Sequence, residues 1–260
     1  MNDIERLLKK GMEFIVIPNE MFYIKGECGY FMELEDYNII MVLLYFQTKK
    51  DFIDDVSFTL SDIIKYCGLK PLKGEGKSID KMKTLLNMLK DRGIIICDID
   101  FNNVKVNDFI RVTFNINEVL NNSFTKIPLK VIDKISNINI KDFRKVLTLW
   151  CYLHCRRYKK SSIGDGKESA TQVSYNTIYR DTGISNDSIN KYLDVLVDNG
   201  LLLKHNSGYL IKDKKCENCN NIYVTVDDTM EIAQGFIHEA ISRYEYEKHS
   251  QGYTISKYTA

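Results

Sequence analysis

The side chains best suited to chemistry in this sequence lie between residues 185 and 200, where amides, hydroxyls, carboxylates and one lysine are interspersed with apolar residues. On a helix, with about 100° per residue, one apolar stripe would face a protein core: Ile189, Tyr192, Leu193 and Leu196. The opposite side carries Asp187, Asn190, Lys191, Asp194 and Asp198. An asparagine amide can pair with adenine, and a lysine with guanine or phosphate. We therefore take four residues as candidate contacts to DNA: Asn186, Ser188, Asn190 and Lys191.

Basic side chains lie on both sides of this segment in the chain. The candidate phosphate contacts before it are Arg144, Lys145, Arg156, Arg157, Lys159, Lys160, Tyr175 and Arg180. The candidates after it are Lys204, His205, Lys212 and Lys214, with Lys215 beside them. Such residues position a protein on the DNA backbone without reading its sequence. The alternative for the polar side of residues 185–200 and for these basic residues is a solvated surface without function. The aspartates opposite the apolar stripe favour this alternative, because acidic side chains repel DNA, although Asp187 also suits a helix N-terminus.

Two further motifs have the spacing of ligand sites. Residues 73–78 end in Gly-Lys-Ser, but Pro71 stands where a phosphate-binding loop has its first glycine. Cys216 and Cys219 have zinc-ligand spacing, but a zinc site needs four ligands. A conceivable other half lies at Cys151, His154 and Cys155. A reduced loop or a disulfide is the favoured interpretation, so we expect no metal and no cofactor. Because no hydrolase, kinase or dehydrogenase signature occurs, we also expect no enzyme.

Composition indicates a globular protein with one large domain or two ordinary ones, since 44% of its 260 residues are hydrophobic and 27% are charged. The longest apolar run, residues 39–46, is too short to span a bilayer. The charged N-terminal residues show no signal-peptide core, so we expect a cytoplasmic protein. The net charge of +1 divides unevenly, into −3 for residues 1–122, +7 for 123–226 and −3 for 227–260. The middle block therefore has the charge expected of a partner for DNA.

The chain contains an internal repeat. Residues 14–18 (Phe-Ile-Val-Ile-Pro) return as residues 124–128 (Phe-Thr-Lys-Ile-Pro), and residues 78–93 align with residues 185–200 without a gap. Both of these longer segments begin with Ser and end in Asp-X-Gly, followed by three aliphatic residues. The offset between the copies falls from 115 at Gly68 to 107 at Ser78, so the first copy holds eight additional residues, 70–77. Because the matches occur in one order, we interpret them as a duplicated domain.

Both copies predict the same elements. A first helix covers residues 34–49 and 140–158, a short second helix covers 60–66 and 174–181, and a third runs from Ser78 or Ser185 to the Asp-X-Gly. The candidate N-caps are Ser61, Ser78, Ser174 or Asn176, and Ser185; the candidate stops are Gly68, Gly93, Gly183 and Gly200. The strands expected after the third helix are 94–98 and 104–115 or 110–115 in copy one, and 201–204, 209–212 and 222–226 in copy two.

Helix, short helix, turn, helix and β-hairpin is the order of a winged helix-turn-helix. The Ile-Pro segments, the Leu-Leu-Tyr-Phe of the first helix and the Asp-X-Gly exit resemble the winged-helix replication initiators of Gram-positive plasmids and phages, over residues 14–226. The resemblance implies a mainly α fold with small β-hairpins (α+β). The repeat divides the chain into a first winged-helix domain (1–122) and a second, basic and DNA-binding one (123–226), followed by a C-terminal part (227–260). In that part, helical spacing over residues 229–248 predicts an amphipathic helix, and residues 249–260 are expected to be a frayed tail.

The first copy presents fewer candidate contacts to DNA. They are Lys70, Lys73, Lys77, Lys83 and Thr84. Its charge of −3 leaves open a role in pairing two copies of the chain, and tandem winged-helix initiators can divide the two roles in this way. We therefore expect double-stranded DNA as the partner, with a homodimer and replisome proteins as further partners and no membrane. A winged-helix transcriptional regulator and a primosome or conjugation scaffold that does not bind DNA are the alternatives.

Overall fold

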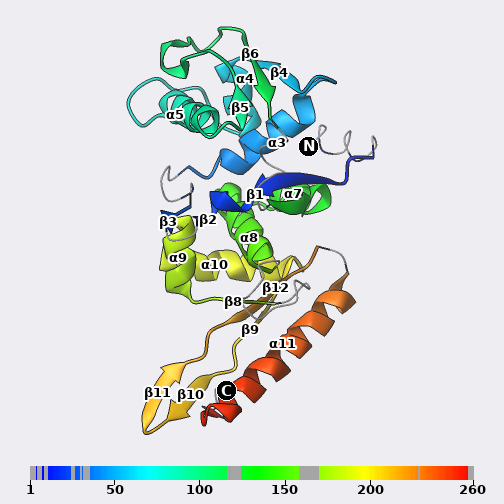
Figure 1. Cartoon of the computed structure of the whole chain (residues 1–260), viewed down its shortest axis with the longest axis vertical. Helices are drawn as coiled ribbons and strands as arrows, with labels where there is room; N and C mark the ends of the chain where they lie inside the picture. The colour runs from blue at the N-terminus through cyan, green and yellow to red at the C-terminus, as the bar shows by residue number, and fades with distance from the viewer. Residues whose placement is uncertain are drawn as a thin grey trace. The chain divides into compact units, whose positions relative to one another are not determined.

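The computed structural model describes residues 11–24, 27–29, 36–115, 124–157, 170–227 and 229–256, together with residues 4, 8, 31 and 117. The protein is a mixed α+β chain whose sheets are small and antiparallel (Figure 1). It divides into two compact units, Met1–Asp133 and Lys134–Ala260. None of the described helices combines the length and the apolar composition needed to cross a membrane.

Unit 1 is built around α3 (Ile39–Lys49). Every residue from Ile39 to Gln47 is buried, because the helix is apolar on all sides and other elements cover all of them. The elements that follow are β4 (Asp55–Phe58), α4 (Leu60–Tyr66), α5 (Ser78–Asp91), β5 (Ile95–Ile96), the 3-10 helix η2 (Phe101–Asn103) and β6 (Ile110–Phe114). The strands form one antiparallel sheet in the order β4-β6-β5.

The two Ile-Pro segments pair with each other. β1 (Phe14–Pro18) and β7 (Phe124–Pro128) form an antiparallel ladder in which Ile15 lies opposite Ile127. The Gln47 side chain secures β1, since it accepts a hydrogen bond from the Val16 amide and donates one to the Val16 carbonyl, both at 2.8 Å. Short elements follow β1, namely η1 (Asn19–Met21), β2 (Tyr23–Ile24) and β3 (Glu27–Cys28), and α7 (Leu129–Ser136) follows β7. The compact units therefore divide at Asp133/Lys134, after the boundary predicted at 122/123.

Unit 2 has a corresponding set of elements around α8 (Phe143–Arg157). These are β8 (Thr171–Gln172), α9 (Tyr175–Thr182), α10 (Asn186–Asp198), β9 (Leu202–His205), β10 (Tyr209–Lys212), β11 (Lys215–Asn218) and β12 (Ile222–Thr225). Trp150 is fully buried, and its indole donates a hydrogen bond of 2.9 Å to the Leu201 carbonyl, which joins α8 to the start of β9. The sheet order is β8-β12-β9.

Both units therefore share one order of elements: helix, strand, helix, helix, strand, strand. In each sheet the last strand lies between the first and the second. The strand before the short second helix, β4 or β8, was not predicted from the sequence, and neither was β11. Unit 2 differs by inserting the β10–β11 hairpin between the second and last strands, so its hairpin region extends beyond the sheet (Figure 1).

The C-terminal residues belong to unit 2. α11 (Met230–Ser250) packs on β9 and β12, and an apolar cluster joins them that includes Leu210, Val224, Ile237 and Tyr244. The predicted frayed tail is a wrong prediction for residues 249–256, because α11 continues to Ser250 and β13 (Thr254–Ser256) pairs with β10. Ile255 lies opposite Leu210 there and packs against the same cluster, which stabilises the strand.

Several predicted helix ends change. Thr59, not Ser61, caps α4, in a capping box with Asp62. Ser78 begins α5 but its hydroxyl binds the backbone of Lys70 and Leu72 instead of capping the helix. Ser185 is the N-cap residue of α10 without a capping hydrogen bond from its side chain. The described helices α3 and α8 begin later than predicted, at Ile39 and Phe143.

Other predicted ends are confirmed. Ser174 caps α9, because its hydroxyl accepts a hydrogen bond from the Thr177 amide. All four predicted stops have the positive φ that favours glycine: Gly68, Gly93, Gly183 and Gly200.

Candidate nucleic-acid interface

The buried side and the exposed side of α10 are the ones that its sequence predicts. Ile189, Tyr192, Leu193 and Leu196 are buried. Asp187, Asn190, Lys191, Asp194 and Asp198 are exposed. Asn186 is exposed and bonds Asn176 of α9 at 3.1 Å, and the half-buried Ser188 accepts a hydrogen bond from Ser185. Among the described residues Lys191 has no hydrogen-bond or ion-pair partner, so its ammonium group can turn toward a ligand.

Asn190 is engaged within the protein. Its Oδ1 accepts hydrogen bonds from the Tyr175 hydroxyl at 2.9 Å and from Lys204 Nζ at 3.0 Å. Its Nδ2 donates to Asp194 at 3.2 Å, and Lys204 lies 3.7 Å from the other Asp194 oxygen. The four residues join α9, α10 and β9 into one network. Adenine recognition uses both ends of an asparagine amide, so Asn190 can read a base only by exchanging these partners.

The contact of Asn190 has a counterpart in unit 1. At the offset of 107 between the copies, Asn190 corresponds to Lys83 and Lys191 to Thr84. Lys83 Nζ donates a hydrogen bond of 2.8 Å to the Asn102 carbonyl, in the connection between β5 and β6. In both units this helix position therefore points toward the segment that follows the helix. The next position, Thr84 or Lys191, is exposed in both.

Arg157 corrects the sequence interpretation. Its side chain is 2% exposed and forms a 2.6 Å ion pair with Asp227, a 2.9 Å hydrogen bond to the Thr225 carbonyl and a contact with the Phe236 ring. His154 lies in the same network, with Nδ1 2.7 Å from the Thr225 hydroxyl. A guanidinium enclosed in this way cannot reach a DNA backbone, so the predicted phosphate contact at Arg157 is wrong. The residue instead joins α8 to β12 and α11.

The other basic residues of α8 and α9 are more accessible. Arg156 is 19% exposed and lies over the Tyr152 ring, 3.4 Å from Asp181. Arg180 is 68% exposed, and its Nε donates a hydrogen bond of 2.9 Å to the same Asp181. Arg144 and Lys145, near the start of α8, are half-buried. Lys159 and Lys160 lie outside the described residues. Tyr175 takes part in the Asn190 network.

The β10–β11 hairpin presents three lysines at its tip. Lys212 lies opposite Lys215, and between them Asp213 and Lys214 form a two-residue turn with φ of 51° and 62°. Lys214 and Lys215 are exposed, whereas Lys212 Nζ donates a hydrogen bond to the Gln251 carbonyl at 2.7 Å. A positive φ is costly for lysine, and such strained positions cluster at functional sites. His205 is not at this tip; it lies in β9, opposite Ile222.

In unit 1 one side of α5 is covered by the connection between β5 and β6. Besides Lys83, Asn87 bonds Asn102 and Lys90 Nζ donates to the Ile99 carbonyl. The candidate residues Lys70, Lys73, Lys77 and Thr84 are exposed. The sequence interpretation missed Lys81, which is also exposed. Lys81 lies four residues after Lys77, on the polar side of α5, so helical spacing could have identified it as a candidate.

The structure redistributes the charge that the sequence assigned to the second domain. At the boundary between the units, residues 1–133 carry 18 basic against 20 acidic residues and residues 134–260 carry 18 against 15, so the contrast is −2 against +3. The helix pairs show the opposite trend. Residues 60–91 hold seven lysines and four acidic residues, whereas residues 175–198 hold two basic and four acidic ones. Positive charge therefore lies beside α5 in unit 1 and on the hairpin tip in unit 2.

The four cysteines considered as metal ligands differ in burial and do not all lie on one element. Cys151 and Cys155 are buried on α8, Cys219 is buried and Cys216 is exposed on β11. Burial, together with the charge of Cys155, raises the pKa of the Cys151 thiol well above its ordinary value of 9.0. Within the described ranges no group of three or more His, Cys, Asp or Glu residues could hold a metal ion.

Comparisons with protein-family models, with curated proteins and with solved structures give no match to this chain.

Proposed function

We propose that this chain is a sequence-specific, double-stranded DNA-binding protein without enzymatic activity, built from two tandem winged helix-turn-helix units. The observation that carries the proposal is the order of elements, which both units share together with the sheet order. In a winged helix-turn-helix the third helix enters the major groove and the hairpin contacts the neighbouring backbone. α5 and α10 take the place of that third helix.

The proposed biological role is initiation of replication of a plasmid, phage or integrative element, in the cytoplasm, at repeated origin sites. It is supported by the Ile-Pro segments, which resemble those of winged-helix initiators. A transcriptional regulator would use the same helices on another site, and a scaffold would not bind DNA.

The full chain is expected to bind duplex DNA with a steep salt dependence. Each phosphate neutralised contributes about −0.9 to the slope of log affinity against log salt concentration. Fluorescence anisotropy with a labelled origin duplex and with a scrambled duplex, between about 0.05 and 0.2 M salt, measures both the slope and the specificity ratio. Absence of binding to either duplex would contradict the proposal and leave the scaffold role. Preference for promoter DNA over origin repeats would instead identify a regulator.

Lys214→Gly is expected to weaken DNA binding without weakening the fold. Glycine adopts a positive φ without the penalty of about 1 kcal/mol that lysine incurs, so thermal unfolding should occur at the same or a higher temperature. Loss of one phosphate contact should lower the salt slope by about one for every sequence alike. Lys214→Arg, which keeps the charge, is the matched control. An unchanged slope for Lys214→Gly would remove the hairpin tip from the interface.

A further inference from the structure

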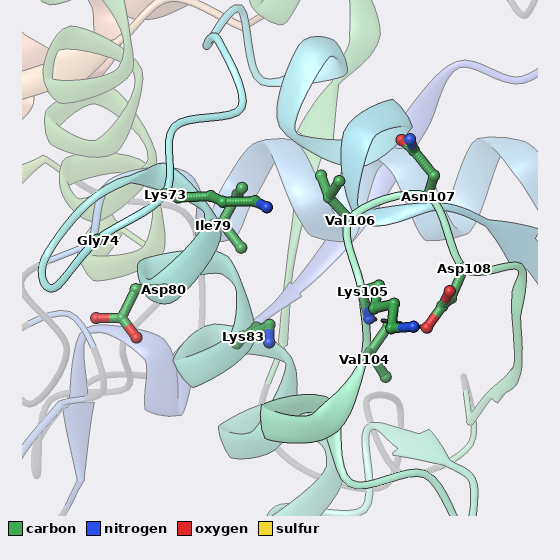
Figure 2. Close-up of a pocket in the computed structure, with 10 residues that line it drawn as sticks. All are labelled: Lys73, Gly74, Ile79, Asp80, Lys83, Val104, Lys105, Val106, Asn107 and Asp108. Carbon is green, nitrogen blue, oxygen red and sulfur yellow. Dashed lines mark hydrogen bonds between the residues drawn. The ribbon is translucent and has the colours of Figure 1, made fainter.

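Unit 1 contains a groove beside α5 that the sequence did not indicate. It has a volume of about 570 Å³ and is lined by the loop before α5, by the first turns of α5 and by residues 104–108. Figure 2 shows Lys73 and Lys83 pointing toward this last segment from the other wall. Lys105 also lines the groove. Three lysines from three separate segments therefore converge on one hollow.

The acidic residues that line the groove accept hydrogen bonds from nearby backbone amides. Asp80 Oδ2 accepts a hydrogen bond of 3.0 Å from the Gly76 amide, and in Figure 2 its carboxylate points away from residues 104–108. Asp108 Oδ2 accepts one of 2.8 Å from the Lys105 amide. Among the described residues neither Lys73 nor Lys105 pairs with a carboxylate. The ammonium groups are therefore available to an anion from outside.

The residues that line the groove indicate which chemical class of ligand it can bind. Ile79, Val104 and Val106 supply apolar lining between the lysines. A sugar-phosphate combines both requirements, because its phosphate carries charge and its sugar ring has apolar faces. Lysine binds phosphate as a point charge, and the backbone of DNA presents phosphates at regular spacing.

We propose that this groove binds a sugar-phosphate of the DNA backbone and thereby makes unit 1 a DNA-contacting unit. The inference rests on the proposed function. It deepens that function because it adds Lys105, on the connection between β5 and β6, to the candidate contact Lys73 on the loop that copy one adds, and assigns both to the DNA backbone. The groove grips DNA of any sequence and does not read bases.

The test uses the full chain and a labelled duplex of mixed sequence, titrated at several salt concentrations. The double variant Lys73→Gln with Lys105→Gln should lower the salt slope by nearly two. The loss of affinity between about 0.05 and 0.2 M salt should then be about tenfold smaller than for the parent chain. Lys73→Arg with Lys105→Arg should retain the parent slope, because both charges remain.

Two controls separate this site from a general effect of charge. Lys126→Gln with Lys130→Gln also removes two lysines of unit 1, from β7 and α7, and should leave the slope unchanged. Asp108→Asn keeps an acceptor for the Lys105 amide but removes a negative charge, so it should strengthen binding. Circular dichroism of each variant checks that it folds as the parent chain does.

Three results would overturn the proposal. The first is a salt slope of the Lys73/Lys105 glutamine variant that equals the slope of the parent chain. The second is a loss of salt slope in the Lys126/Lys130 glutamine variant that equals the loss in the Lys73/Lys105 glutamine variant. The third is saturable binding of dAMP at the groove that the glutamine variant abolishes while its DNA binding is unchanged, which would make a free nucleotide the ligand. If the parent chain binds no DNA, the proposed function itself fails. If the parent chain binds DNA but the Lys73/Lys105 glutamine variant has the same salt slope, the groove proposal alone fails.

Discussion

Asp227→Ala is expected to lower the free energy of unfolding by about 3 kcal/mol, because it removes the carboxylate that faces a buried guanidinium. Arg157 is 2% exposed and its Nη1 lies 2.6 Å from Asp227 Oδ1. Once the carboxylate is lost, a cation stays enclosed between α8, β12 and α11 with reduced compensation. Urea denaturation of the full chain at neutral pH measures the loss.

The loss in the free energy of unfolding caused by Asp227→Ala should become smaller at acidic pH. Burial raises the pKa of Asp227, but the charges of His154 and Arg157 and the Arg157 hydrogen bond outweigh it and hold the pKa below the ordinary 3.8. A carboxyl with a lowered folded-state pKa stabilises the fold above its unfolded-state value and loses that contribution as pH falls through the folded-state pKa. The difference between the parent and Asp227→Ala should therefore be constant near neutrality and shrink below about pH 4.

Two matched variants distinguish the buried pair from an ordinary surface contact. The double variant Arg157→Met with Asp227→Leu should recover most of the stability, since replacing both members of a buried pair by apolar residues is often nearly neutral. Glu239→Ala breaks an exposed pair with Arg243 on α11, whose side chains are 66% and 56% exposed. It should cost no more than about 0.5 kcal/mol. Equal effects for Asp227→Ala and Glu239→Ala would contradict the assigned role of Arg157.

Lys191→Ala is expected to reduce the preference for the cognate site by about 1–3 kcal/mol, or roughly 5- to 150-fold. Lys191 is exposed on α10 and has no partner among the described residues, so it is better placed than Asn190 to contact a base edge. Anisotropy with cognate and scrambled duplexes measures the ratio of affinities. Lys214→Gly is the control, because a lost phosphate contact should weaken both duplexes equally.

Asn190→Ala tests whether its network positions the helix or reads DNA. If Asn190 exchanges its partners to bind adenine, the ratio should fall at one base position. If it only organises Tyr175 and Lys204, affinity should fall for both duplexes and the ratio should persist. Should the ratio survive both Lys191→Ala and Asn190→Ala, α10 is not the reading helix, and α5 with Lys77, Lys81 and Thr84 becomes the candidate.

Local periodicity is what made much of this fold predictable. The stripe of Ile189, Leu193 and Leu196 predicted the buried side of α10, because residues three and four apart share a helix face. Gly93 and Gly200 predicted where α5 and α10 stop, because a left-handed residue there favours glycine. The duplicated order of elements could be read because both copies keep these same local signals.

Short strands escaped prediction because their signals are not local. β8 has two residues and β13 three, too few to show alternation, and each forms only by pairing with a strand distant in sequence. β7 carries the same Ile-Pro signal as β1, yet nothing in either segment states that the two pair with each other. Pairing depends on which partner the tertiary fold brings opposite, and this moved β7 into unit 1.

The candidate site divides in the same way. The amino-acid sequence by itself determined which residues are charged and which side of α10 is polar, since both follow from residue type and helical spacing. Only the tertiary structure decided which charges are accessible. It buried Arg157 against Asp227, tied Asn190 to Lys204, and left Lys73 and Lys105 facing one groove. The physical reason is that the availability of a side chain depends on neighbours from other elements, which the spacing of residues along one helix does not specify.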